Sequence, residues 1–429
     1  MTTHEIIRDP LWNNIRVDPL ARALVDTDVF QRLRYVRQLG LAYLVYPGAT
    51  HSRFEHALGA YHLAGVALGI LAEGGELAAA ADDEPAIVRA AALLHDVGHY
   101  PFSHALEEIG VAHHEEVAHP LITRGPVADI LRNGLGADAP ERVHALVRGT
   151  GGSPLGGLIS GSLDLDKIEY LKRDAIMCGV PYGEIDVDRL LNALVIVEDP
   201  ATGRRAVGVR EKGLSALESL LFAKYQMYRN VYWHHAVRSA TAMYKRLVGD
   251  ALAAGALRAD ALAGFTDEGL LHRLEDQPLP ATGLLSRLRT RRLYKRAFES
   301  PAAEVGDRTA AEWVATDRPL AVEVENRLAD ELQIPHGSVL LDYPAKTQML
   351  GVDILVVSRG GGVRHLTSND SDTAMNLPAL SEQLYRSARW LRVYSAERIA
   401  LPRERVLALL RLPADEVRAT LARGTALLA

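Results

Sequence analysis

The first half of the chain gathers histidine and aspartate residues at spacings that could hold a metal ion. Nine of the sixteen histidines fall between positions 51 and 119, in the stretches HSRFEHALGAYH, LLHDVGHYPFSH and HHEEVAH. A later stretch, LDLDKIEYLKRD, adds aspartates among apolar residues. Imidazoles and carboxylates are costly to bury unless they are paired or bind a cation. The concentration therefore predicts a polar site inside an otherwise apolar region.

The adjacent residues His95 and Asp96 lie at the centre of this pattern. Neighbouring side chains on a helix diverge by about 100°, so the pair can share one ion only if other segments complete the site. His56 and Asp166 are the natural suppliers. Mixed imidazole and carboxylate ligands suit a divalent ion with open water positions, such as Fe, Mn, Mg, Ni or Zn. An all-thiolate site is excluded because Cys178 is the only cysteine.

Composition narrows the class of protein. The 429 residues are 48% hydrophobic and 24% charged, with a formal net charge of −6. This charge argues against a dedicated duplex-binding protein, which needs a basic surface to displace counterions. A single cysteine suits a reducing cytoplasm, and the most apolar run, over 57–72, is too short to span a bilayer. We therefore expect a cytoplasmic protein with no membrane partner.

Hydrophobic periodicity predicts helices over almost all of 54–250, preceded by a helical pattern at 20–36. Within this region, two β-branched runs around Asp-Pro-Ala-Thr-Gly predict a hairpin at 194–210. A single long helix is predicted over 213–254. Shorter helices and a basic cluster, RLRTRRLYKR at 287–296, follow.

The last third of the chain alternates strands and helices. A helix is predicted over 378–396, and an Arg/Leu-rich helix over the last 25 residues. Strands are predicted at PLAVEVEN (319–326), SVLLDYP (338–344), GVDILVVS (351–358) and LRVYSAE (391–397). The fold class is therefore mainly α, a helical body with a smaller α+β C-terminal region. We expect the body at 1–255, a helical connection with the basic cluster at 256–310, and the α+β region at 311–429.

The sequence motifs resemble those of the HD-domain phosphohydrolases. The resemblance is to the branch that contains the sterile-alpha-motif/HD-domain deoxynucleoside triphosphate triphosphohydrolases and their bacterial relatives. The similarity covers about residues 5 to 396 and is densest before 180. It is carried by IIRDPLWNNIRVDP, DTDVFQRLRYVRQLGLAYLVYPGATHSRFEHALGAYHLAG, LLHDVGHYPFSH, HHEE, LDLDKIEYLKRDAIMCGV, YQMYRNVYWHHAV, DYPAK, VDILVV and RVYS. The resemblance implies an HD-type helical domain with metal ligands His56, His95, Asp96 and Asp166.

The resemblance also implies a reaction. A metal-bound water attacks the α-phosphorus of a dNTP and releases a deoxynucleoside and intact triphosphate. His104 matches the family's acid, Glu107 would orient it, and His114 would hold a phosphate oxygen. Asp164 would also contact His104. Additional Mg²⁺ is expected to accompany the triphosphate.

Substrate contacts follow from the same resemblance. The residues that match phosphate-binding positions are Arg53, His99, Lys167 and Lys224. The residues that match positions around the sugar, and would favour deoxyribose by leaving no room for a 2′-hydroxyl, are Gln38, Tyr170, Asp174 and Tyr232.

A second nucleotide site, for an effector such as GTP, dGTP or another dNTP, is implied at subunit contacts of a homotetramer or dimer of dimers. A carboxylate opposite an arginine can read a guanine edge while the guanidinium engages phosphate. The matching residues are Asp26, Gln31, Arg34, Arg291 and Lys295.

Two alternatives stay open at this point. HD sites also cleave monophosphates, cyclic nucleotides and alarmones, so the substrate could be another nucleotide. Alternatively, the basic cluster and the C-terminal arginines could belong to a nucleotide sensor or a single-stranded nucleic-acid binder. Aromatic residues are only 6% of the chain and none interleave with that cluster, which disfavours nucleic acid. The sequence leaves open the preferred base, the native metal, the effector and the biological role.

Overall fold

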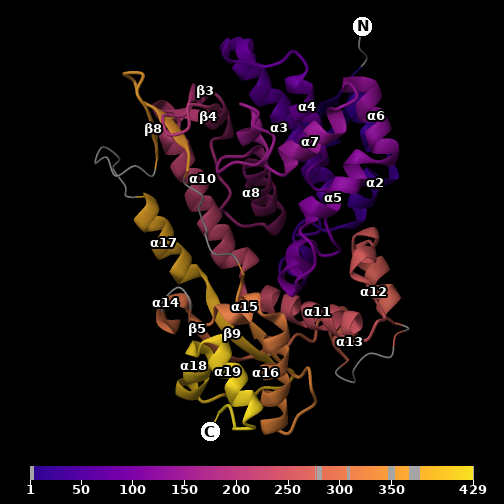
Figure 1. Ribbon diagram of the computed structural model, residues 1–429, viewed down its shortest axis with the longest axis vertical. Helices are drawn as coiled ribbons and strands as arrows, with labels where there is room; N and C mark the ends of the chain where they lie inside the picture. The colour runs from indigo at the N-terminus through magenta and orange to yellow at the C-terminus, as the bar shows by residue number, and fades with distance from the viewer. Residues whose placement is uncertain are drawn as a thin grey trace.

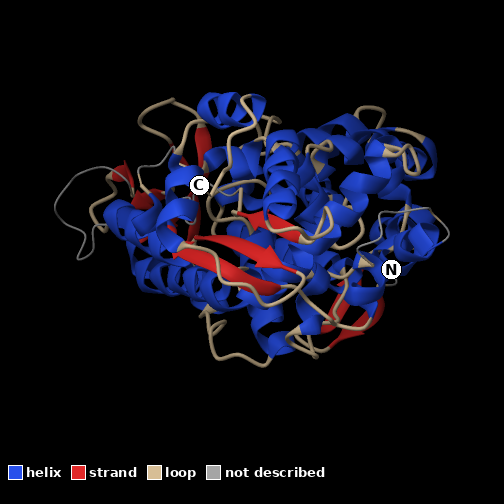
Figure 2. Cartoon of the chain, turned by 90° about the horizontal axis from the view of Figure 1, so that it is seen from below, coloured by secondary structure: helices blue, strands red, loops and turns tan. Residues whose placement is uncertain are grey.

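The computed structural model describes residues 4–275, 277, 283–306, 310–345, 353–366 and 377–428. Figure 1 shows a helical body, coloured indigo to magenta, above a smaller region of helices and strands coloured orange to yellow. Seen from below, the strands form small patches among the helices (Figure 2). The predicted class, mainly α with a smaller α+β region, is confirmed.

The residues before the first helix form a β-hairpin that the periodicity did not predict. Strand β1 (Glu5–Asp9) pairs antiparallel with β2 (Asn13–Val17). The Asp9 carboxylate accepts hydrogen bonds from the backbone N–H groups of Leu11 and Trp12, both at 2.8 Å, and so closes the turn. Each strand has only five residues, so its alternation is too short to stand out from the helical pattern that follows.

The long helix α3 (Arg53–Glu73) contacts α4 (Glu84–Leu94) and α8 (Leu165–Cys178) inside the body. A capping box starts it, because Ser52 caps the first turn and its own N–H is bound by Glu55. The helix is apolar around most of its circumference, as expected for one surrounded by other elements. The other helical elements before residue 214 are α1 (Pro19–Val25), α2 (Asp28–Gln31), η1 (Arg32–Tyr35), η2 (Gly40–Leu44), η3 (Glu76–Ala79), η4 (Ser103–Ile109), α5 (His114–Thr123), α6 (Gly125–Leu135), α7 (Ala139–Val147), η5 (Gly156–Leu158), α9 (Val187–Leu191) and η6 (Glu211–Gly213).

The single helix predicted over 213–254 is wrong, because the chain breaks in the middle. Helix α10 (Leu214–Met227) passes into a π-helical turn, η7 (Tyr228–Tyr232), and α11 (His235–Ala253) begins after it. His234 caps α11 by accepting the N–H of Ala236 at 3.3 Å. Helical periodicity continues on both sides of the break, so the pattern of apolar residues alone conceals it.

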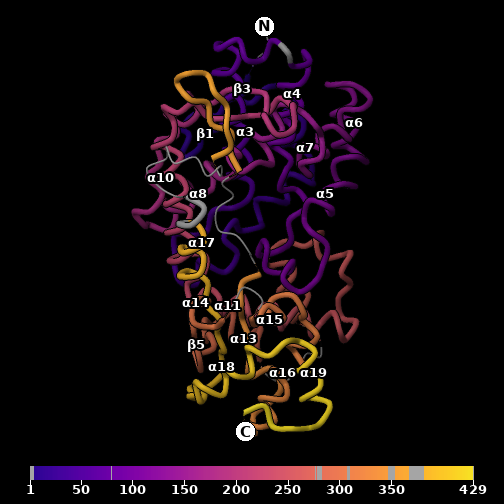
Figure 3. The backbone as a smooth tube through the Cα atoms, turned by 60° about the vertical axis from the view of Figure 1, so that its left-hand side comes forward, coloured from indigo at the N-terminus to yellow at the C-terminus, as the bar shows by residue number. Residues whose placement is uncertain are grey.

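The hairpin predicted at 194–210 is confirmed as β3 (Leu194–Glu198) and β4 (Arg205–Arg210). Strand β4 also pairs in parallel with β7 (Leu355–Val357), which pairs with β8 (Val363–His365). Figure 3 shows this C-terminal segment in orange, rising beside the body. The sheet joins the first and last of the three ranges into which we divided the chain, and those boundaries stay predictions.

A second sheet lies in the C-terminal region, with the antiparallel order β5 (Lys295–Pro301), β9 (Trp390–Ser395), β6 (Val339–Asp342). It confirms the strands predicted at 338–344 and 391–397. The basic cluster does not lie on one helix, since α13 ends within it and β5 starts at its end. The helices of this half are η8 (Ala259–Gly264), α12 (Asp267–Glu275), α13 (Leu284–Arg289), α14 (Ala302–Val305), α15 (Glu312–Thr316), α16 (Arg318–Glu331), α17 (Leu377–Ala388), α18 (Arg403–Arg411) and α19 (Ala414–Ala422).

The strand predicted at 319–326 is wrong, because these residues belong to helix α16. Asp317 caps the helix by accepting the N–H of Leu320 at 3.2 Å, and Pro319 occupies the first turn. Apolar residues alternate over this short stretch as they would in a strand. The buried residues of the whole element nevertheless recur at helical spacing, which a window of eight residues is too short to separate.

The C-terminal helix is also split, into α18 and α19, ahead of Ala414. Pro413 lacks an N–H and cannot continue the first helix. Residues 351–352 of the strand predicted at 351–358, and Lys346 of the DYPAK motif, lie outside the described residues. Within the described ranges, no helix combines the length and the apolar character that crossing a membrane requires.

Candidate active site

Three segments bring the four expected metal ligands together. His56 lies in the first turn of α3, His95 and Asp96 follow the end of α4, and Asp166 lies in the first turn of α8. His56 Nε2 is 2.9 Å from Asp166 Oδ1 and 3.2 Å from His95 Nε2. Asp96 oxygens lie 3.6 Å from His56 Nε2 and 3.4 Å from His95 Nε2. Donors bound to one ion at about 2.1 Å are roughly 3–3.5 Å apart, so this spacing fits a single ion.

Hydrogen bonds on the far side of both rings place a proton on Nδ1, so Nε2 is the nitrogen that can bind an ion when the ring is neutral. His56 Nδ1 donates to Glu169 Oε2 at 2.6 Å, and His95 Nδ1 donates to the carbonyl of Ala92 at 2.8 Å. Both partners only accept, so each neutral ring carries a lone pair on Nε2. Burial opposes a charge on His56, yet Glu169 and Asp166 raise its pKa to about 10. An electrostatic field that attracts a proton so strongly also suits a divalent cation.

Glu169 is a supporting residue that our sequence analysis missed. It is fully buried on α8 and accepts hydrogen bonds from His56, from Trp12 Nε1 at 3.0 Å and from Arg173 Nε at 2.7 Å. A Cβ at Gly59 would overlap its carboxylate, so this glycine allows Glu169 to reach α3. Carboxylates that bind the outer nitrogen of a ligating histidine fix its tautomer and orientation. The signal was available, because Glu169 lies one helical turn after the ligand in LDLDKIE.

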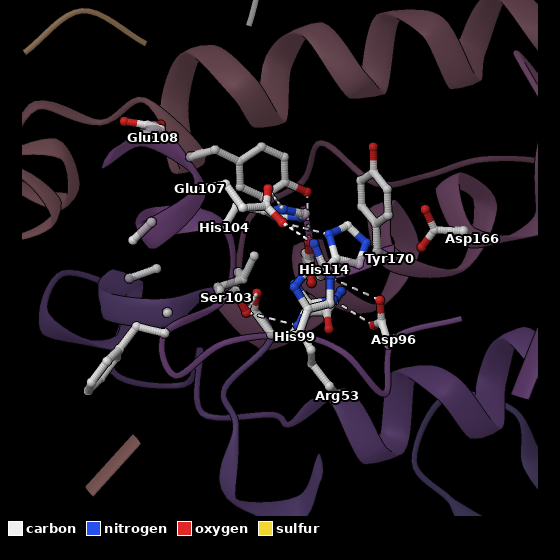
Figure 4. Close-up of a pocket in the computed structure, with 18 of the residues that line it drawn as sticks. Arg53, Asp96, His99, Ser103, His104, Glu107, Glu108, His114, Asp166 and Tyr170 are labelled. Atoms are coloured by element: carbon white, nitrogen blue, oxygen red, sulfur yellow. Dashed lines mark hydrogen bonds and ion pairs between the residues drawn. The ribbon is translucent and has the colours of Figure 1, made fainter. Parts of the chain in front are cut away.

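Three histidines gather around Glu107 in the same cavity (Figure 4). Glu107 accepts hydrogen bonds from His104 Nδ1 at 3.0 Å and from His114 Nδ1 at 2.6 Å. Burial favours the neutral carboxyl, but these two hydrogen bonds hold the pKa of Glu107 well below its usual value. The third ring, His99, stacks on His114 with centroids 3.7 Å apart. His104 is 62% exposed and can therefore exchange protons with solvent.

The loop at 97–103, which links the two clusters, has an unusual backbone. Phe102 and Ser103 have φ values of 57° and 63°, in the left-handed region that side chains rarely occupy. Asp267, from α12, holds this conformation by accepting the N–H of Phe102 at 2.7 Å. Burial raises the pKa of Asp267 to about 6. A Cβ at Gly98 would overlap the backbone of α5, so this glycine permits the loop and α5 to touch.

The cavity has a volume of about 710 Å³ and is lined by His95, Asp96 and Asp166 together with predicted phosphate-binding residues. Arg53 donates to Asp96 Oδ2 at 2.5 Å and to Ser103 Oγ at 2.9 Å. Burial lowers the pKa of His99 well below its usual value, and the Arg53 charge lowers it further, so its ring is neutral. The remaining predicted contact, Lys224, is buried on α10 and is not among the residues that line the cavity.

Asp164 does not contact His104 in the way we expected. Its carboxylate caps α8 by accepting the N–H of Lys167 at 2.9 Å, and it also forms an ion pair with Lys167 Nζ. The physical reason is its position directly before the helix, where an aspartate satisfies free backbone N–H groups. Asp164 therefore positions Lys167 at the cavity wall.

The predicted sugar-binding residues, Gln38, Tyr170, Asp174 and Tyr232, all line this cavity. Asp174 accepts hydrogen bonds from His51 Nε2 and Tyr232 Oη, both at 2.7 Å. The rings of Tyr232 and Tyr170 are 6.4 Å apart. Gln38 Oε1 is buried and has no hydrogen-bond partner among the described residues. His51 was not predicted, since its contact with Asp174 spans 123 residues of sequence.

The predicted effector residues form two groups. Gln31 Oε1 accepts from Arg34 Nε at 2.8 Å, and Asp26 lies 3.7 Å from Arg22 on the same surface. The other two residues, Arg291 and Lys295, line a separate cavity of about 620 Å³. The two groups therefore do not share a cavity within one chain.

Comparison with known proteins places the chain in a family. A family model described as the HD domain matches residues 53–156, and one described as an HD associated region matches 185–408. An uncharacterized protein of Methanocaldococcus jannaschii is 32% identical over 331 residues, which are 76% of this chain and 67% of the relative. A protein of Dictyostelium discoideum, named as a deoxynucleoside triphosphate triphosphohydrolase homologue, is 27% identical over 73% of this chain and 64% of its own length.

The solved structures agree with this placement. A hypothetical protein from Aquifex aeolicus superposes with a TM-score of 0.70 at 27% identity, covering 98% of this chain and 100% of that one. The chain spans about two thirds of the archaeal relative, and 55–56% of three further uncharacterized bacterial relatives. The match to the HD associated region covers just over half of the chain, and the match to the archaeal relative covers 76% of it. The chain therefore belongs to the HD-domain phosphohydrolase family, in the group whose HD domain is followed by an HD associated region.

Proposed function

We propose that the protein is a metal-dependent triphosphohydrolase that converts a dNTP to a deoxynucleoside and inorganic triphosphate. One observation carries the proposal: a single cavity holds three of the four metal ligands, the predicted acid and the sugar-reading residues. Similarity to the Dictyostelium discoideum relative, whose name states this activity, supports the choice of substrate.

The four ligands would hold a divalent ion, which supplies a water of lowered pKa and offsets charge on the phosphates. The protein's own contribution lies at the other side of the reacting phosphorus. A protonated His104 donates its Nε2 proton to the departing 5′-oxygen, while Glu107 holds its Nδ1 proton. Glu107 remains a carboxylate at neutral pH because of its lowered pKa, so it stabilises this positive ring. A protonated His114, fixed by the same carboxylate, would donate its Nε2–H to a phosphate oxygen.

The charge balance of the cavity supports the expectation of additional Mg²⁺. Among the described residues, its lining has seven carboxylate side chains but only three lysine or arginine side chains, Arg53, Lys167 and Arg238. Each of these cations is already paired with a carboxylate. A triphosphate entering this cavity would be repelled unless divalent ions came with it.

The residues predicted to contact the sugar support a deoxynucleotide substrate over a ribonucleotide. The Gln38 Oε1 atom, which has no partner among the described residues, would accept a hydrogen bond from the 3′-hydroxyl, and His51 and Tyr232 hold Asp174 in the same cavity. Tyr170 packs beneath the ring and leaves no room for a 2′-hydroxyl.

Nucleotide regulation is the second part of the proposal. Arg291 and Lys295 line a cavity with Arg296 and Arg398, a concentration of positive charge that suits a triphosphate. The other group, Asp26, Gln31 and Arg34, would complete the effector site from a second copy of the chain in a homotetramer or dimer of dimers.

Product analysis tests the reaction directly. Protein of measured metal content is incubated with each dNTP, with and without GTP, and the products are separated by ion-exchange chromatography. We expect deoxynucleoside and inorganic triphosphate in equal amounts. Release of only orthophosphate or pyrophosphate contradicts the proposal, and turnover of monophosphates, cyclic nucleotides or alarmones in place of dNTPs supports the alternative substrate class.

A double variant supplies the control for contaminating phosphatases. His95→Ala with Asp96→Ala removes two ligands from the metal centre, and we expect it to lose all turnover while it stays folded. Asp129→Asn is the matched surface control, because this side chain is 69% exposed and pairs only with Arg132 among the described ion pairs.

A further inference from the structure

A third group of possible metal ligands lies on the surface of the body, on helices α5 and α7. His119 comes from α5, and Glu141 and His144 come from adjacent turns of one face of α7. One donor atom from each of the three residues lies within 4.8 Å of the others. His119 Nε2 is 3.5 Å from Glu141 Oε2, close to the roughly 3.4 Å that separates two donors of a tetrahedral ion.

The hydrogen bonding of His144 prepares it as a ligand. Its Nε2 lies 3.0 Å from the carbonyl oxygen of Glu115. A carbonyl only accepts, so Nε2 carries the proton and the neutral ring has its lone pair on Nδ1. Ligating histidines commonly donate their second N–H to a carbonyl or carboxylate in this way. The ring centroids of His144 and His119 are 4.6 Å apart in an edge-to-face contact, so the two histidines are direct neighbours.

Nearby cations are occupied elsewhere and do not neutralise the group. Arg142, which follows Glu141 in sequence, pairs with Asp83 and Glu84 at the start of α4. Arg148 lies 3.2 Å from Glu116. Glu141 is therefore free of an arginine partner among the described ion pairs and is 67% exposed, which gives an ion a path to the site.

We propose that His119, Glu141 and His144 form a second metal site, distinct from the HD centre, for a borderline divalent ion such as Zn²⁺ or Ni²⁺. Two imidazoles and one carboxylate leave a fourth position for water. The ion would tie α5 to α7. Because α5 begins at His114, about 7–8 Å along the helix from His119, the site also braces the helix that carries an active-site residue.

Metal stoichiometry tests this site without reference to any enzyme activity. The His95→Ala/Asp96→Ala protein, which lacks two ligands of the HD centre, is titrated with Co²⁺ and followed by its visible absorption. We expect one Co²⁺ per chain, with the intense bands of a four- or five-coordinate ion. Adding His144→Ala should abolish this binding. In the otherwise native chain, Zn²⁺ content after dialysis should fall from two ions per chain to one with His144→Ala.

A matched control separates the proposed site from a generic histidine–carboxylate pair. His272 lies on α12, is 78% exposed and bonds Glu275 at 2.9 Å, but it belongs to none of the groups of three possible ligands found among the described residues. His272→Ala should leave the stoichiometry unchanged. Absence of Co²⁺ binding in the double variant, or binding that survives His144→Ala, overturns the proposal. Binding that is lost with His114→Ala instead assigns the ion to the cluster around Glu107, and also overturns it.

Discussion

The two polar ends of the active-site cavity are built in opposite ways. At the metal-binding end, His56 is fully buried, and its outer nitrogen is held by a carboxylate, Glu169, that is itself buried and bound by two further donors. At the other end, His104 is 62% exposed and is fixed by one described hydrogen bond, to Glu107.

This difference matches the chemistry that each end would perform. The donor atoms of a cation site repel one another until the ion is bound. Such a site therefore benefits from ligands that the protein holds rigidly and shields from water. A group that donates a proton in every cycle must recover it from solvent, so exposure serves His104. On the proposed assignments, the buried His56 would bind the ion and the exposed His104 would exchange a proton.

Removal of a metal ligand should have the largest effect. Asp166→Asn keeps the size of the side chain but removes the charge that faces His56 and His95. We expect bound divalent ion to be lost and turnover to fall by about 10⁴-fold or more, since the water loses its activating ion. Metal analysis and initial rates measure both effects. Asp129→Asn is the control, and a variant that keeps metal but loses activity would contradict the assignment of Asp166 as a ligand.

A smaller loss is expected at the exposed end. His104→Ala should lower kcat by about 10²–10⁴-fold, the usual range for loss of a general acid. Metal content should be unchanged, because none of the four ligands contacts this ring among the described hydrogen bonds. A drop in bound metal equal to that of Asp166→Asn would remove the distinction between the two ends. His272→Ala, which changes an exposed side chain, provides the matched control.

The sequence identified the residues that meet at the proposed metal position better than it identified the residues that support the cavity. His95 and Asp96 are adjacent in sequence. His56 and Asp166 each lie in a short motif, HSRFEHALGAYH and LDLDKIEYLKRD, that is recognisable from local sequence alone. The contacts of Asp267 with Arg37 and Phe102 bridge 230 and 165 residues, and no local pattern encodes them. Supports of this kind depend on how distant elements pack, which a single sequence does not display.

The same dependence on the packing of distant elements explains which helices and strands were predicted correctly. The hairpin at 194–210 has a turn whose residues are typical of turns, so local chemistry decides its structure. Residues 319–326 fit a strand or a helix equally well, and the choice depends on the cap at Asp317 and on packing further along α16. Periodicity therefore succeeds where local and tertiary preferences agree.

Weakening a support should have an intermediate effect. Glu169→Gln leaves the ligands in place but removes the carboxylate that holds the Nδ1 proton of His56. We expect metal affinity to fall about 10–100-fold, as for comparable outer partners of ligating histidines. Competition with a coloured chelator measures the change, and Glu73→Gln at the exposed end of α3 is the control. An unchanged affinity would show that packing alone orients His56.

The smallest effect concerns stability at the exposed end, through the carboxylate that anchors its loop. Burial raises the pKa of Asp267 to about 6, above its value of 3.8 in a model compound. The folded state therefore takes up a proton before the unfolded state does, and this group adds stability as the pH falls from about 6 toward 4. Between pH 7 and pH 5 the gain is about 1 kcal/mol.

Asp267→Asn should remove this gain. The variant is expected to be less stable than the native chain at both pH values, because an amide cannot accept the N–H groups of Phe102 and Arg37 together. Its free energy of unfolding, from urea titrations at pH 7 and pH 5, should rise less on acidification than that of the native chain, by about 1 kcal/mol. Equal pH responses would mean that Asp267 is ionised in the folded protein at pH 5, as Glu107 is. The loop of the exposed end would then be anchored by charge, and only the exposure of His104 would distinguish the two ends.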